Sequence, residues 1–148
     1  MATIFQFRDR VSQLSTERIE SDLLTIVKKN EETVTNMNTD QLFGGKDAKG
    51  KDLPDYSKRS VEVFEKRAGP WKLFETGDFY RGFFVKVDKF PISIFSNDQK
   101  TGKIADALLS KGQNPDDIYG LNKENQSDLN KSYILADLQK TIRNTLGI

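Results

Sequence analysis

The sequence predicts an α+β domain in which a long N-terminal helical segment and a C-terminal helix pack on a small antiparallel sheet. Two patterns predict this fold class. Near both ends of the chain, apolar residues recur at three- and four-residue steps, which is typical of one face of a helix. From Phe83 to Asp88, the positions 83, 85 and 87 are apolar and share one face, which is typical of a strand that covers a core.

The 148 residues are expected to form a single domain with three parts. Residues 1–43 form the helical segment, residues 44–112 form a loop, helix and antiparallel hairpin core, and residues 113–148 form the C-terminal helix. In the first part, residues 2–14 are expected to form a short helix with a partly buried side. Ser15-Thr16-Glu17 then begins a longer helix that runs to Leu42. Asparagines at positions 30, 36 and 38 predict a break or kink, and Gly44-Gly45 ends the helix.

The middle part begins with a loop over residues 46–55. Ser57 is the expected N-cap of a helix that Gly69-Pro70 terminates. Thr76 is expected to cap a single helical turn that leads into the hairpin. The first strand begins at Gly82, and its partner covers residues 91–96.

A short helix is predicted over residues 101–111. Asn122 is the expected cap of the last helix, and Gly147 ends that helix. Its buried side is predicted from apolar spacing to comprise Leu129, Tyr133, Ala136, Ile142 and Leu146.

Composition excludes several kinds of site. The chain has no cysteine and no histidine, so it has no disulfides, no Cys/His zinc centre and no Cys or His nucleophile–base pair. A reducing compartment is compatible with this composition. No apolar run is long enough to cross a bilayer, and we expect no cofactor and no membrane contact.

Charge is unevenly distributed along a chain whose net charge is +1. Residues 16–42 carry six acidic and three basic groups, whereas residues 43–72 carry eight basic and five acidic groups. The simpler interpretation is two solvated faces of opposite sign. The alternative is that the acidic face of one copy meets the basic face of the next, which would steer assembly.

Two motifs that suggest chemistry are incomplete. Gly45 to Lys51 has the G-x-x-x-x-G-K spacing of a phosphate-binding loop, but Asp52 stands where Ser or Thr should follow. The segment also follows a helix instead of a strand, so we reject a nucleotide site. Acidic pairs such as Asp47 with Asp52 have the spacing expected from scattered acids, and a turn or cap role accounts better for Asp78.

An aromatic cluster is the candidate interaction surface. Neighbours on a strand point to opposite faces, so one of two adjacent phenylalanines must face something other than the main core. Aromatic side chains are enriched at protein interfaces. The candidate interaction residues are Trp71, Phe74, Phe79, Tyr80, Phe83 and Phe84.

The stretches Gly45-Lys-Asp-Ala-Lys-Gly-Lys-Asp-Leu-Pro-Asp-Tyr-Ser57 and Leu73-Phe-Glu-Thr-Gly-Asp-Phe-Tyr80 resemble small virion proteins of tailed bacteriophages. The resemblance is to the virion-morphogenesis and tail-completion (head–tail connector) group, particularly in phages of gut Bacteroidetes. It covers Gly45 to about Val87, under half of the chain. The residues that carry it are expected to shape turns and helix starts: Gly45, Asp47, Gly50, Tyr56, Ser57, Leu73, Thr76 and Gly77.

The resemblance implies a non-enzymatic virion structural protein, assembled in the host cytoplasm, that forms a ring or connector at the head–tail junction or tail end. Its expected partners are copies of itself and other phage head, neck or tail proteins. Two alternatives stay open. One is an accessory metal-dependent nuclease that uses acids such as Asp47 or Asp78. The other is a DNA-contacting module in which the basic residues between Lys46 and Lys72 make non-specific phosphate contacts.

Overall fold

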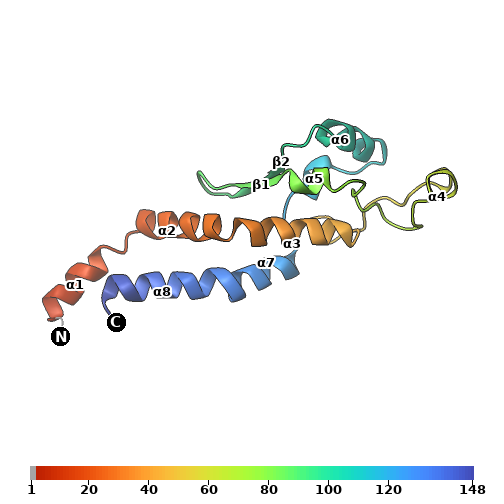
Figure 1. Cartoon of the computed structure of the whole chain (residues 1–148). Helices are drawn as coiled ribbons and strands as arrows, with labels where there is room; N and C mark the ends of the chain where they lie inside the picture. The colour runs from red at the N-terminus through yellow and green to blue at the C-terminus, as the bar shows by residue number, and fades with distance from the viewer. Residues whose placement is uncertain (1–2) are drawn as a thin grey trace.

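The computed structural model describes residues 3–148, so the expected helix start at Ala2 lies outside the described residues. Five helices precede the two consecutive strands, and further helices follow them (Figure 1). In order, the elements are α1 (Ile4–Ser12), α2 (Thr16–Lys29), α3 (Glu31–Phe43), α4 (Lys58–Val63), α5 (Asp78–Arg81), β1 (Phe83–Lys86), β2 (Ser93–Ser96), α6 (Thr101–Ser110), the 3-10 turn η1 (Pro115–Ile118), α7 (Lys123–Leu129), the π turn η2 (Asn130–Ile134) and α8 (Leu135–Leu146).

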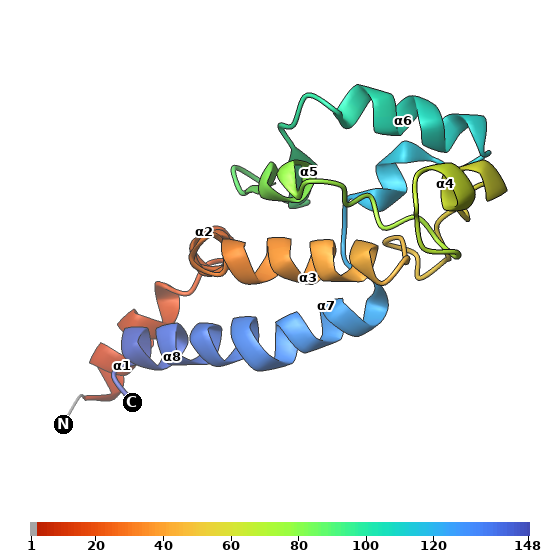
Figure 2. The same cartoon turned by 45° about the vertical axis from the view of Figure 1, so that its right-hand side comes forward.

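Two antiparallel helical rods form the base of the molecule. One rod is α2 followed by α3, and the other is α7, η2 and α8, which returns alongside it (Figures 1 and 2). The hairpin β1–β2 and α6 lie on the side of α3 that faces away from α7, and both chain ends lie near the free end of the rods. The α+β class, with helices packed on a two-stranded antiparallel sheet, is confirmed.

The first rod breaks at Asn30, as expected. Asn30 leaves the helical region at φ −99° and ψ 18°, and its side-chain amide donates to the carbonyl of Ile26 at 2.8 Å. Asn36 and Asn38 lie inside α3, so the kink expected from them is wrong. The buried amide of Asn38 bonds instead to a segment 80 residues further along the chain. That long-range bond explains why a poor helix former is placed mid-helix.

The hairpin has the predicted faces. Val85 pairs with Ile94, and both side chains are buried, whereas the exposed Phe84 lies opposite Phe95 on the outer face. The main-chain N–H of Val85 points away from β2 and donates to a carboxylate oxygen of Glu31 at 3.0 Å. This bond fastens the edge of β1 to the first turn of α3.

The core lies where α3, the hairpin and the segment after α6 meet. Its most buried apolar side chains are Leu42, Leu53, Leu108 and Ile118. Each such side chain contributes on the order of 1.5–3 kcal/mol relative to leaving it in water. Three of these four residues belong to the stretch between the two rods, so the rods alone do not make this core.

The helix after Ser57 is shorter than predicted. Ser57 caps it as expected by accepting from the N–H of Ser60 at 3.1 Å, but α4 ends at Val63, well before Gly69-Pro70. Val63 and Phe64 are both more than half exposed. The six-residue helix α4 has no buried residue to stabilise it, and isolated short helices are marginal in water.

The predicted capping role of Thr76 is wrong. Gly77, with φ +82°, is the residue that precedes α5, and no side-chain cap bond is present there. The hydroxyl of Thr76 bonds to the carboxylate of Asp78. The single turn itself, Asp78–Arg81, forms as expected.

The buried side of the last helix is shifted by one residue after Leu129. The π turn inserts an extra residue, because the N–H of Leu135 bonds to the carbonyl of Asn130, five residues back. As a result Ile134 is buried, whereas Tyr133 and Ala136 are exposed, contrary to prediction. Ile142 and Leu146 are half-buried, and the predicted start at Asn122 and end at Gly147 are confirmed.

The first helix has no buried side, contrary to prediction. Within α1 every described apolar side chain is exposed, including Ile4 at 75% and Phe5 at 67%. Its position is nevertheless fixed against the end of the second rod, where the guanidinium of Arg10 donates to the carbonyl of Leu146 at 3.0 Å.

Candidate interaction surfaces

The six predicted aromatic residues divide between core and surface. Phe79 and Phe83 are buried and pack edge to face with ring centroids 5.2 Å apart. These two residues are therefore core residues and do not form a free surface. Phe74 and Phe84 are exposed at 45% and 38%.

Trp71 and Tyr80 are half-buried, and each lies beside another aromatic ring. Trp71 lies beside Tyr56, with ring centroids 6.5 Å apart, and Tyr80 lies against Phe74 at 5.5 Å. Burial raises the pKa of Tyr80, so its hydroxyl stays protonated and donates to the carbonyl of Lys72. The hydroxyl of Tyr56 accepts from the N–H of Lys72 at 3.2 Å. The two tyrosine hydroxyls therefore bond both main-chain groups of Lys72.

The loop that carries the phage resemblance is built around a buried carboxylate. One oxygen of Asp47 accepts from the N–H groups of Lys49 and Lys51 at 2.9 and 2.8 Å. Gly45 has φ +79°, and a Cβ there would lie 2.7 Å from the Cβ of Pro70. Gly50 also has a positive φ, of +77°. These residues shape the loop, in line with the role the resemblance implies for them.

The second group of motif residues meets at a small hollow beside α5. Tyr56, Leu73, Thr76 and Gly77 line this hollow, which has a volume of about 240 Å³. Leu73 adopts a positive φ of +51°, an uncommon conformation for a leucine. Ser57 does not line the hollow and acts only as the cap of α4.

Several basic residues of the 46–72 stretch are already engaged. Lys46 and Lys49 form ion pairs with Asp52 and Asp117 at 2.7 and 2.8 Å. The ammonium of Lys72 donates to the last carbonyl of α3 at 3.0 Å. These lysines hold the loop to its surroundings, so fewer cations are available for phosphate contacts than the sequence suggests.

The carboxylate of Asp78 also serves a local structure. The hydroxyl of Thr76, and after it the guanidinium of Arg81, hold the pKa of Asp78 below its ordinary value. Across residues 3–148, no three acidic side chains gather in a way that would hold a metal ion. The nuclease alternative stays a prediction, and the two acids it invoked lie in separate parts of the fold.

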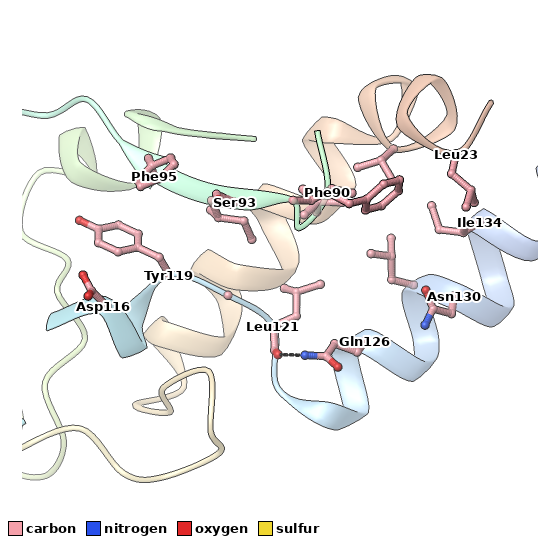
Figure 3. Close-up of a pocket in the computed structure, with 16 residues that line it drawn as sticks. Leu23, Phe90, Ser93, Phe95, Asp116, Tyr119, Leu121, Gln126, Asn130 and Ile134 are labelled. Carbon is pink, nitrogen blue, oxygen red and sulfur yellow. Dashed lines mark hydrogen bonds between the residues drawn. The ribbon is translucent and has the colours of Figure 1, made fainter. Parts of the chain in front are cut away.

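Sequence reasoning missed an open apolar groove of about 580 Å³ between the hairpin and the helical rods (Figure 3). Leu23 and Val27 of α2 form one wall, and Phe90 and Ile92 of the hairpin turn form another. Leu129 and Ile134 of the second rod, together with Leu121 just before it, form the floor. No periodic pattern could reveal this groove, because its lining comes from segments more than 100 residues apart.

Buried polar bonds fix the floor of the groove. The side chain of Asn38 donates to the carbonyl of Ile118 at 3.0 Å and accepts from the N–H of Gly120 at 2.9 Å. One turn later, Gln41 donates to the carbonyl of Gly120 at 3.1 Å and accepts from the N–H of Asn122 at 2.8 Å. We call these two side chains the amide bridge. It ties residues 118–122 to α3 at four points.

The described residues therefore leave apolar side chains exposed at several places, and two of these places are the side of α1 and the lining of the groove. Exposed apolar patches mark interaction sites in folded proteins when they are large. Taken over residues 3–148, no helix combines the length and the apolar character needed to cross a membrane.

Comparisons with known proteins give no relatives: no family model, no curated protein and no solved structure matches this chain.

Proposed function

We propose that this protein is a virion structural subunit of a tailed phage, in which copies pack into a ring or connector at the head–tail junction or tail end. The support from sequence is the resemblance over Gly45 to about Val87. The observation that carries the proposal is the pair of apolar surfaces, α1 and the groove, that one described chain leaves uncovered.

Such surfaces suit a subunit that completes its packing in an assembly. A connector subunit works by contact, and the residues that carry the resemblance here make turns, caps and bonds between loops. The exposed rings of Phe74 and Phe84 would each add contact area for neighbouring virion proteins.

The test is mass spectrometry of tailed-phage particles purified from a culture that carries this gene. We expect the protein in the particles at a ring-like copy number, and immunogold labelling at the neck or tail end. Absence of the protein from purified particles would refute the proposal. A monomer in isolation would not, because connector subunits can assemble on their neighbours.

A further inference from the structure

We propose that α1 of one copy docks into the apolar groove of a neighbouring copy. The inference deepens the proposed function, on which it rests, by naming the contact through which copies join. The donor and the acceptor are different surfaces of the same chain, so the contact is heterologous and leads to a closed ring or an open filament.

The donor is a preformed amphipathic helix. Ile4, Phe7 and Val11 share one face at i, i+3 and i+7 spacing, and Phe5 lies beside them. A capping box supports the helix without any partner. The side chain of Gln6 accepts from the N–H of Thr3 at 2.9 Å, and the hydroxyl of Thr3 accepts from the N–H of Gln6. The apolar face is therefore ordered before docking.

The acceptor has a suitable size and lining. Its volume of about 580 Å³ lies within the range of roughly 300–1,000 Å³ that is common for sites that enclose a ligand. Leu23 of α2 and Ile134 of η2 face it (Figure 3), and Ile92 lines it from the hairpin turn. An apolar helix face needs an acceptor of this kind, in which side chains enter between walls.

A copy does not fill its own groove in this structure. The bond from Arg10 to the carbonyl of Leu146 holds α1 at the end of the second rod. Gly147 lies so close to that guanidinium that a Cβ at this position would overlap it. Figure 1 shows α1 beyond the end of the rods, away from the hairpin that forms one wall of the groove. The occupant must therefore come from another molecule while this attachment persists.

Charge agrees with a second copy as the occupant. α1 carries the exposed Arg8 and the attached Arg10 against a single acid, Asp9. The groove has Asp116 as its charged lining residue, whereas α2, which forms one wall, carries three acidic and three basic groups. The excess positive charge of α1 is thus complemented by one exposed carboxylate in the lining.

The contact is small. Phe5 and Phe7 are 67% and 37% exposed, so together they would bury on the order of 200 Å², because a full aromatic side chain buries roughly 150–250 Å². A stable two-body interface buries about 1,200–2,000 Å². Each copy in a ring donates one helix and accepts another, so we expect association that strengthens with protein concentration and with ring closure.

Cysteine cross-linking tests the contact directly, because the native chain has no cysteine. One full-length variant carries Phe5→Cys, and a second, affinity-tagged variant carries Ile92→Cys. The two are mixed at high protein concentration and oxidised. The control partner carries Leu109→Cys, an exposed site on α6 outside the groove. We expect roughly tenfold more mixed dimer with Ile92→Cys than with the control, because docking raises the local thiol concentration.

Two outcomes would overturn the inference. The first is a mixed-dimer yield equal to that of the Leu109→Cys control. The second is an intramolecular disulfide when Phe5→Cys and Ile92→Cys stand in one chain diluted with cysteine-free protein, because α1 would then fill its own groove. Protein found in virions without the cross-link would refute the docking and leave the proposed function standing. A cross-link in a protein that is absent from virions would support the docking and refute the proposed function.

Discussion

Replacing Asn38 by alanine should destabilise the fold strongly, although alanine is the better helix former. The side chain of Asn38 is 0% exposed and bridges α3 to the carbonyl of Ile118 and the N–H of Gly120. Both groups would lose their partner in a site from which water is largely excluded. An unsatisfied buried group costs roughly 1–3 kcal/mol, so we expect a loss of about 2–4 kcal/mol in the free energy of unfolding.

Urea unfolding followed by circular dichroism measures this loss, with Asn36→Ala as the matched control. Asn36 lies on the exposed side of the same helix, and its replacement should change stability by less than about 0.5 kcal/mol. The Asn38→Ala variant should also melt roughly 5–15 °C lower, given about 2–4 °C per kcal/mol for chains of this size. Equal stability of the two variants would refute the view that the amide bridge holds the groove floor.

Two further substitutions test other parts of the account. Gly45→Ala should lower the free energy of unfolding by more than about 2 kcal/mol, because it combines a left-handed backbone with overlap against Pro70. Gly50→Ala should lower it by only about 1 kcal/mol, because φ is +77° but no atom lies within 4 Å of the added Cβ. Thermal unfolding of both variants measures the difference. The bond from Lys28 is the main cause that lowers the pKa of Glu31, so this carboxylate stabilises the fold above its ordinary pKa of 4.5 and loses that effect as pH falls through the lowered value. The free energy of unfolding of Glu31→Gln should therefore be up to about 1 kcal/mol lower than that of the native protein at pH 7, and the two values should converge in acid. A stability difference that does not change with pH would contradict the assignment.

Local signals in the sequence predicted much of the fold. Ser57 and Asn122 cap helices as expected, since a short polar side chain before an apolar stripe binds free N–H groups. The faces of the hairpin followed from alternation, and the break at Asn30 followed from a poor helix former between two stripes. Each of these features depends on residues within a few positions of one another.

Features that depend on distant contacts were not predictable. The π turn shifts Ile134 into the position that uniform helical spacing gives to Tyr133, and no glycine or proline marks it. Asn38 was interpreted as a cause of a kink because its partners lie 80 residues away. Of the candidate interaction residues, Phe79 and Phe83 proved to be core. Phe83 lies on a strand, where alternation alone does not tell which face the rest of the chain covers, and Phe79 is the buried residue of the short helix α5.

The amide bridge and a bond from Gln126 together hold the floor of the groove in place. The bridge fixes residues 118–122 by polar bonds, and the amide of Gln126 donates to the carbonyl of Leu121 at 2.6 Å, so the floor does not depend on collapse of the hairpin onto it. A preformed acceptor lowers the cost of ordering groups on binding. Loss of the bridge should therefore also weaken docking. When Asn38→Ala is added to the Ile92→Cys copy, under conditions where this copy remains folded, the yield of the cross-link to the Phe5→Cys copy should fall. An unchanged yield would mean that the hairpin and α2 alone shape the acceptor.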